Sequence, residues 1–400
     1  MSVKGRSPFY PGQPVPIELF VGRQEQIDKI VSRGVKQVAE GKSMAMFVQG
    51  DYGIGKSSIA RYTQFLAEQK YGLLGIYASL GGTTSLDEMG SAILEATVRS
   101  GALNPKNSEQ IRNLLAKYIG EQSIFGFTIH AEALKKDAPR LASPNGLLPF
   151  FAETLNRVKV NGIKGIFLIL DEVNGITANP KFAHFIKGLV ESNAMSSDQT
   201  PLLLMLCGVE ERRREMIKNH QPIDRIFEII DIKTLDKAEM EKFFMRAFAS
   251  VQTAVDPSAL ETMTKYSAGF PKIMHLVGDA AYWIDRDDKI DHEDALRAVI
   301  AAADDVGKKF VDQQVYAALR SKDYHSILAK IAKMGPDAMS FMKQDLEKGL
   351  TANEKKKLNN FLQKMKKLRV LKMGETRGEW LFTMRMVRFY IWLDSLKSPE

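Results

Sequence analysis

Four short apolar runs divide the first half of the chain. They are separated by stretches in which apolar residues recur at helical spacing. Strands that are apolar throughout and alternate with helices are typical of a parallel sheet that is covered by helices on both faces. The pattern therefore predicts an α/β domain with strands at 44–48, 74–80, 166–170 and 202–206.

A glycine-rich segment follows the first of these runs. Residues 50–57 read Gly-Asp-Tyr-Gly-Ile-Gly-Lys-Ser, and a helical pattern without breakers begins at Ser58. Glycines let such a loop turn its N–H groups toward phosphates, and the helix N-terminus adds a favourable dipole. The lysine then reaches the β- and γ-phosphates, while the serine hydroxyl ligates Mg²⁺. A plain glycine-rich turn is the alternative. We expect ATP or ADP with Mg²⁺ to contact Gly50, Asp51, Tyr52, Gly53, Ile54, Gly55, Lys56, Ser57 and Ser58.

An acidic pair ends the third run. Asp171 and Glu172 follow the apolar residues 166–170. A phosphate-binding loop needs a carboxylate near Mg²⁺ and, for hydrolysis, a second group that orients water. We therefore expect Ser57 and Asp171 to form the metal site and Glu172 to position the attacking water. An acidic pair that merely ends a strand in solvent is the alternative.

The sequence as a whole predicts three domains, of which the nucleotide-binding domain is the first. Residues 1–235 form the nucleotide-binding domain, with a proline-rich arm at 1–19 and an insertion at about 101–146 that has a possible hairpin at 123–131. Helical patterns at 236–320 predict a small helical lid. Residues 321–400 predict three helices followed by a two-stranded hairpin, which is the arrangement of a winged helix.

The net charge of +8 belongs to this last segment. Residues 321–400 hold 17 Lys and Arg against 9 Asp and Glu, so the rest of the chain is neutral. A localised positive charge indicates an acidic partner. Lysines neutralise phosphates without reading bases, so we expect DNA binding of low sequence specificity. The alternative is a solvated helix that contacts protein. The predicted DNA contacts are Lys355, Lys356, Lys357, Lys364, Lys367 and Arg377.

With these motifs the chain resembles AAA+ ATPases of the clade that contains archaeal and eukaryotic replication initiators. It is also similar to transposition AAA+ regulators and STAND-type signalling ATPases. The resemblance implies that Phe20, Val21 and Arg23 lie beside the adenine. It also implies that Pro271 and Lys272 form a second sensor for the γ-phosphate. A lysine there keeps the charge of the usual arginine but loses its bidentate geometry.

The same resemblance implies an ATP site shared between subunits. Arg225 matches the arginine that reaches a neighbouring subunit's phosphates, so hydrolysis would require assembly into a homo-oligomer. The cluster at 212–214 is the competing source of this arginine. The first sensor departs from the family pattern, because residues 207–211 read Cys-Gly-Val-Glu-Glu where a polar Asn, Thr or Ser is usual. Slow turnover is therefore expected.

Three functions are compatible with this sequence. The first is an ATP-hydrolysing switch that assembles and acts on DNA. The second is a STAND-like signalling ATPase whose winged helix contacts a protein effector, and the third is a DNA-binding regulator that holds ATP without hydrolysing it. No apolar run approaches the length of about 18 residues that spans a bilayer, so we expect a cytoplasmic protein.

Overall fold

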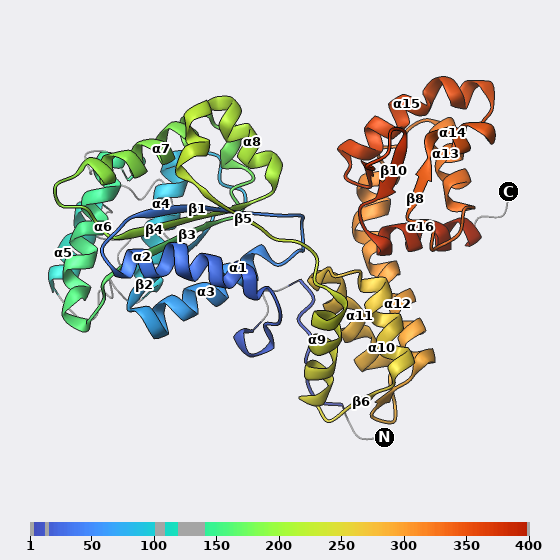
Figure 1. Ribbon diagram of the computed structural model, residues 1–400, viewed down its shortest axis with the longest axis horizontal. Helices are drawn as coiled ribbons and strands as arrows, with labels where there is room; N and C mark the ends of the chain where they lie inside the picture. Colours follow the sequence, from blue (N-terminus) through green and yellow to red (C-terminus); the bar gives the residue numbers. More distant parts are fainter. Residues whose placement is uncertain (1–3, 13–15, 101–108, 119–140, 398–400) are drawn as a thin grey trace. The chain divides into compact units, whose positions relative to one another are not determined.

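A computed structural model describes residues 4–12, 16–100, 109–118 and 141–397 (Figure 1). The chain divides into two compact units. One unit is Pro14–Lys233, and the other combines Thr234–Glu400 with the N-terminal segment up to Gln13. We describe each unit by itself. No helix among the described residues is long and apolar enough to cross a membrane.

The first unit is built on a five-stranded parallel sheet. Its strand order is β2-β3-β4-β1-β5. Every residue of β3 and β4 is buried, which explains their continuous apolar sequence. The four predicted strands are confirmed, and β5 is an additional short strand. The bounds are β1 Met44–Gln49, β2 Leu73–Ser79, β3 Gly165–Asp171, β4 Leu202–Gly208 and β5 Glu228–Asp231.

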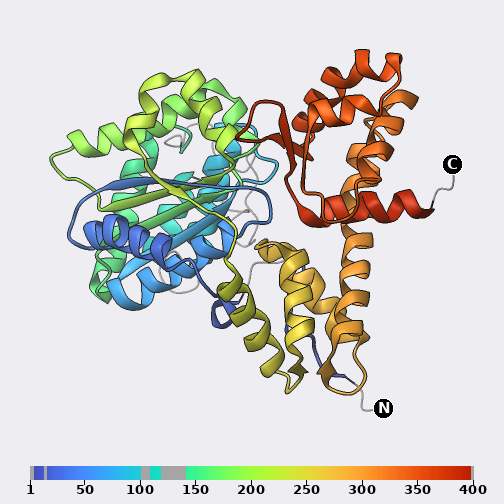
Figure 2. The ribbon, with the colours of Figure 1, turned by 45° about the vertical axis from the view of Figure 1, so that its right-hand side comes forward.

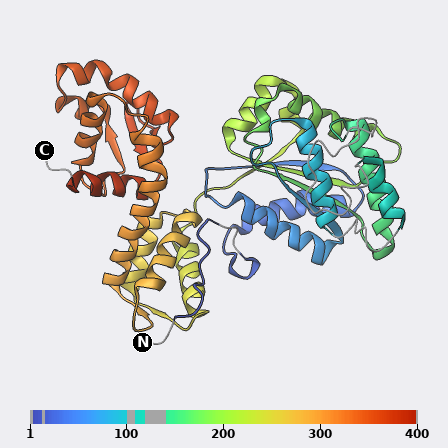
Figure 3. The ribbon, with the colours of Figure 1, turned by 180° about the vertical axis from the view of Figure 1, so that it is seen from behind.

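Helices cover both faces of this sheet. Figures 1 and 3 show α1, α2 and α3 on one face and α6 and α7 on the other. The helix α5 lies within the predicted insertion, where Tyr118 packs edge-on against Phe150 of α6 at 5.2 Å. The possible hairpin at 123–131 lies outside the described residues. The bounds are α1 Gln24–Ile30, α2 Lys36–Ala39, α3 Lys56–Tyr71, α4 Leu86–Arg99, α5 Glu109–Tyr118, α6 Pro144–Val158, α7 Pro180–Met195 and α8 Glu210–Asn219.

The second unit begins with the predicted helical segment. Four helices pack together: α9 Lys237–Ala249, α10 Pro257–Ser267, α11 Pro271–Ile284 and α12 His292–Val306. A π-helical segment, Gly307–Tyr316, continues α12. A Cβ atom at Gly307 would lie 2.1 Å from the Tyr390 ring, so the absence of a side chain lets the last helix approach closely.

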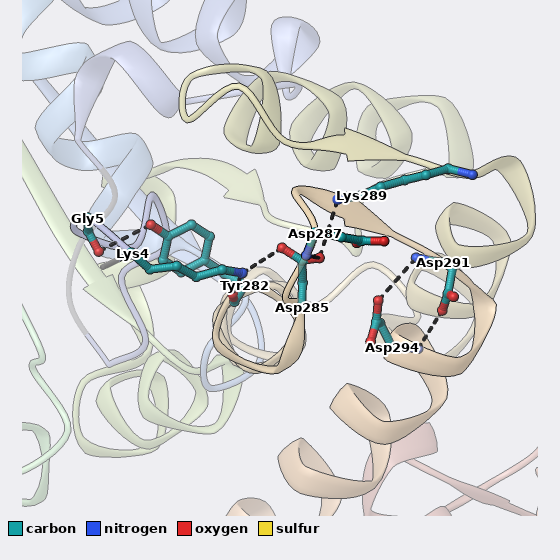
Figure 4. Close-up of polar contacts among 8 residues, drawn as sticks. All are labelled: Lys4, Gly5, Tyr282, Asp285, Asp287, Lys289, Asp291 and Asp294. Atoms are coloured by element: carbon teal, nitrogen blue, oxygen red, sulfur yellow. Dashed lines mark hydrogen bonds and ion pairs between the residues drawn. The ribbon is translucent and has the colours of Figure 1, made fainter. Parts of the chain in front are cut away.

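The first part of the N-terminal arm, up to Gln13, belongs to this second unit, whereas the sequence assigned all of residues 1–19 to the nucleotide-binding domain. The Lys4 ammonium lies 2.5 Å from the Asp285 carboxylate, and the Tyr282 hydroxyl donates to the Gly5 carbonyl (Figure 4). Phe9 is buried against Phe243, Phe244 and Phe248 of α9 and against Gly278 of α11. Burial of this aromatic ring explains why the arm joins the helical unit.

The C-terminal part contains the three predicted helices and the predicted hairpin. It also contains a third strand, so that its antiparallel sheet has the order β8-β10-β9. The last helix, α16, packs against α12 and α13, so 236–320 and 321–400 lie in one compact unit (Figure 2). The bounds are α13 Lys322–Ala332, β8 Ser340–Met342, α14 Lys343–Lys348, α15 Ala352–Lys367, β9 Leu371–Met373, β10 Glu379–Phe382 and α16 Arg385–Lys397.

The buried Arg388 connects α16 to the end of α13 and to the segment that follows it. Arg388 is fully buried, and burial lowers its pKa to about 10, so its side chain is charged at neutral pH. Its guanidinium donates to the carbonyls of Ile331 and Ala332 at 3.1 Å, to that of Ala338 at 3.2 Å and to that of Gly335. Arg388 thereby adds a charged donor to the carbonyls at the end of α13, where Ile331 and Ala332 also accept backbone N–H groups from the turn that follows.

We expect Arg388→Ala to lower the free energy of unfolding of this unit by about 2–4 kcal/mol, because the fully buried side chain and its charged hydrogen bonds to four carbonyls are lost. Denaturant unfolding followed by tryptophan fluorescence reports on this unit alone, since all three tryptophans lie in it: Trp283, Trp380 and Trp392. Arg385→Ala, which removes a partly exposed partner of Asp337 from the same helix, is the control and should cost about 1 kcal/mol or less. Equal unfolding midpoints for the two variants would contradict this role.

Candidate nucleotide-binding site

The loop between β1 and α3 has the backbone that its glycines permit. Gly53 and Gly55 have φ angles of 73° and 101°, in the left-handed region that favours glycine. A Cβ atom at Gly50 would lie 2.7 Å from the Ile232 carbonyl oxygen, so this position requires a residue without a side chain. The Ile54 side chain is only 1% exposed and anchors the loop in the core.

Lys56 is the first residue of α3. Its ammonium donates hydrogen bonds to the Gly50 carbonyl at 2.9 Å and the Asp51 carbonyl at 2.8 Å. It also lies 5.6 Å from the centre of the exposed Tyr52 ring. The loop therefore holds a positive charge beside the N-terminus of a 16-residue helix, which favours a phosphate group.

The carboxylate of Asp171 is buried at the end of β3. Only 3% of this residue is exposed. One carboxylate oxygen accepts a hydrogen bond from the Tyr77 hydroxyl of β2, and the other accepts one from the Glu172 N–H at 2.8 Å. Burial and the Asp171 carboxylate raise the pKa of Tyr77, so the hydroxyl stays protonated and remains a donor. The Arg61 guanidinium packs over the Tyr77 ring at 3.9 Å.

Glu172 has an unusual backbone conformation. Its φ angle is 57°, which is uncommon for a residue with a side chain and costs conformational energy. The Glu172 carboxylate lies 3.4 Å from the Ser79 hydroxyl, and a Cβ atom at Gly81 would lie 2.3 Å from one of its oxygens. The end of β2 and the turn after it therefore fix the direction of the Glu172 side chain.

The fully buried Cys207 lies on the strand between the two halves of the site. Cys207 is on β4, which lies between β1 and β3 in the sheet. Burial and the Asp171 carboxylate raise the pKa of this thiol well above its usual range, whereas the Lys56 ammonium acts in the opposite direction. The sheet brings Lys56 and Asp171 to the same edge.

The predicted N-terminal residues reach this edge by way of the loop. Phe20 stacks on the Tyr62 ring of α3, with centroids 4.4 Å apart and planes inclined by 10°. Arg23 is buried and donates to the Ile54 carbonyl of the loop and to the Lys233 carbonyl at 2.9 Å. Arg23 therefore braces the loop against the end of the first unit. Val21, two residues before Arg23, is partly buried.

Arg225 is exposed on the turn Gln221–Ile226. Within the residues that the structure describes, it forms no hydrogen bond or ion pair. The three competing arginines of α8 each have partners: Arg212 pairs with Glu215 at 3.0 Å, Arg213 with Asp224 and Gln49, and Arg214 with Glu210 at 2.7 Å. Of these four arginines, Arg225 is the one whose charge is available to another molecule.

The other predicted residues lie in the second unit. Pro271 and Lys272 begin α11, and Lys272 is exposed. Lys355, Lys356, Lys367 and Arg377 are also exposed. Lys357 is exposed as well, but it pairs with Asp323 at 2.5 Å, and the half-buried Lys364 donates to the Ala318 carbonyl. The last two lysines therefore contribute to the unit's own structure, and the nucleotide contact of Lys272 stays a prediction.

The oxygen ligands at the loop suit Mg²⁺. Ser57 is in the first turn of α3, and Asp171 supplies a carboxylate at the same sheet edge. Among the described ranges, no group of three or more His, Cys, Asp or Glu could hold a metal by itself. Mg²⁺ usually binds through one or two protein oxygens together with substrate phosphates and water, so the two residues fit this ion.

Several polar residues at this edge were missed from the sequence. Tyr77 and Arg61 support Asp171. Gln49 ends β1 directly before the loop, donates to Asp231 at 2.6 Å and accepts from Arg213 at 2.9 Å. The available signal was a polar residue at the end of an apolar strand. The hydrogen-bond partners of Gln49 depend on the sheet order and carried no local signal.

Comparisons with known proteins identify the architecture. The family model of the "BREX system ATP-binding protein BrxC/D" matches residues 16–122. A Walker-type ATPase of Pyrococcus abyssi is 16% identical, with a TM-score of 0.59 over 93% of this chain and 96% of that chain. The ORC2 protein of Aeropyrum pernix, in ADPNP-ADP complexes, is 13% identical, with a TM-score of 0.61 over 97% and 96%. The fold is that of a P-loop AAA+ ATPase. No curated protein matches the chain.

We expect Arg23→Ala to weaken ATP binding about tenfold, because the Ile54 carbonyl and its loop lose a buried charged donor. Titration with a fluorescent ATP analogue measures the dissociation constant. Arg33→Ala is the control. It removes an exposed arginine that pairs with Glu228 shortly after α1, and this variant should bind ATP as the wild type does. Unchanged affinity in Arg23→Ala would show that the loop needs no such brace.

Proposed function

We propose that this protein is an ATP-hydrolysing AAA+ switch that assembles through ATP sites shared between subunits and acts on DNA. The observation that carries the proposal is the shared edge of the sheet. There the Lys56 loop, the buried Asp171 and the strained Glu172 come together. The same chemistry is supported by the matched family of ATP-binding proteins and by the similar structures, a Walker-type ATPase and a protein in ADPNP-ADP complexes.

The proposed reaction assigns one task to each group. Lys56 and the N–H groups of the loop would bind the phosphates of ATP, and Ser57 with Asp171 would hold Mg²⁺, which would neutralise charge on the phosphates. Tyr77 keeps the Asp171 carboxylate in place. Glu172 orients the water that attacks the γ-phosphate. Pre-positioned groups of this kind lower the barrier because they need no rearrangement during the reaction.

A neighbouring subunit would supply a further cation, Arg225, to the ATP site. Arg225 is exposed and has no partner within the described part of its own chain, which suits a side chain that enters a neighbouring subunit's site. Arginine stabilises the charge that develops on the transferred phosphoryl group. Lys272 is proposed as the second sensor of the same nucleotide. Hydrolysis would then reset an assembly that loads on or releases from DNA.

The proposed DNA contact is α15 of a winged helix. Helix α15 carries exposed lysines, and Arg377 lies in the turn between β9 and β10. The runner-up is a regulatory ATPase whose C-terminal part contacts a protein effector. This second function is favoured by one observation: two of the six predicted cations, Lys357 and Lys364, are used inside the unit.

We expect Glu172→Gln to lose at least about 100-fold in ATP hydrolysis, because the amide cannot orient and polarise water as a carboxylate does. Binding of an ATP analogue should stay within about threefold. Glu191→Gln is the matched control. It removes the partly exposed carboxylate that pairs with Lys187 on α7, and this variant should hydrolyse ATP as the wild type does. Unchanged hydrolysis in Glu172→Gln would remove Glu172 from the mechanism.

The wild-type measurements test assembly and DNA together. Phosphate release per subunit should rise with protein concentration if the ATP site is shared. It should change again when duplex DNA is added. A rate that is independent of both variables would contradict the assembly and DNA parts of the proposal and leave a self-contained ATPase.

A further inference from the structure

One face of α15 carries a regular stripe of polar side chains. The buried side of the helix is formed by Leu358, Phe361, Leu362 and Met365. On the opposite side, exposed residues recur at alternating spacings of three and four, which places them on a single line along the helix. The stripe consists of Asn353, Lys356, Asn360, Gln363 and Lys367.

The chemistry of this stripe differs from that of an ordinary solvated helix. Three of its five members are amides. Asn360 lies in the interior of the helix, where asparagine is disfavoured because its side chain competes for backbone hydrogen bonds. Within the described ranges, no stripe side chain forms a hydrogen bond or ion pair. Helix stability therefore does not account for Asn360.

No carboxylate disturbs the stripe. The one acidic residue of α15, Glu354, is buried on the core side and accepts hydrogen bonds from Lys330 and Ser326 at 2.6 Å. Lys357 and Lys364, which lie beside the stripe, bond within the unit. The stripe thus combines two cations with three amides, each of which can both donate and accept hydrogen bonds, and it contains no negative charge.

We propose that this amide stripe reads DNA bases in the major groove and so makes α15 sequence-specific. The inference rests on the proposed DNA function. Asn and Gln amides pair in a bidentate manner with adenine N6 and N7, whereas lysines hold the phosphates on either side. The lysines alone predicted low specificity. Asn360 and Gln363, between Lys356 and Lys367, add preference for sites that contain adenine.

The experiment uses the full-length protein and a pool of randomised duplex DNA. Bound DNA is recovered over repeated rounds and sequenced, and affinity for the enriched site is compared with affinity for unselected duplex. Three variants are tested: Asn360→Ala with Gln363→Ala, Lys356→Ala with Lys367→Ala, and Gln344→Ala, which removes an exposed amide of α14 as the control.

The wild type and Gln344→Ala should enrich one adenine-containing motif. The amide variant should lose roughly tenfold or more in affinity for that motif while binding unselected duplex as before. The lysine variant should weaken binding to all duplexes alike and reduce the slope of log affinity against log salt by about 2. These results together would support readout by the stripe.

Two other results are distinguishable. Salt-sensitive binding without an enriched motif, or a motif that survives in the amide variant, would overturn the readout and leave the proposed DNA function intact. Failure of the wild type to retain duplex DNA at low salt would overturn the DNA function itself and favour a protein partner.

Discussion

The carboxyl ends of β1, β4 and β3 emerge at one edge of the sheet because the strands are parallel and adjacent in that order. This constraint determines where phosphate chemistry can occur. The loop after β1 delivers Lys56 and Ser57 to that edge, and β3 delivers Asp171 and Glu172. An antiparallel pairing, or the exchange of two strands, would separate the cation from the carboxylates. Each proposed step of catalysis depends on this sheet order.

Buried hydrogen bonds then position the individual groups at this edge of the sheet. Tyr77 donates to Asp171, and Arg23 donates to the Ile54 carbonyl in the loop. In the other unit, Arg388 has a similar function for the end of α13. Such donors are expensive to bury without partners, so each one favours a single local geometry. Tyr77 and Arg23 thereby hold Asp171 and the loop in place, and Arg388 holds the end of α13.

The sequence was most informative where the requirement is local. Glycines at 53 and 55 are required by their own backbone angles, so the loop could be read directly, and the apolar runs predicted the buried strands. The brace at Arg23 was harder to find, because its acceptors lie far along the chain at Ile54 and Lys233. The same reason explains the arm, whose Phe9 packs against α9. No short-range pattern records those pairings.

The proposed intersubunit site is tested most directly by mixing two inactive variants. Arg225→Ala keeps its own loop and Glu172, whereas Glu172→Gln keeps the arginine that a neighbour would need. Each variant alone should hydrolyse ATP at a small fraction of the wild-type rate, and a mixture should recover a substantial part of it, since some mixed sites combine both intact residues. Wild-type hydrolysis by Arg225→Ala alone, or a mixture as inactive as its components, would contradict a shared site.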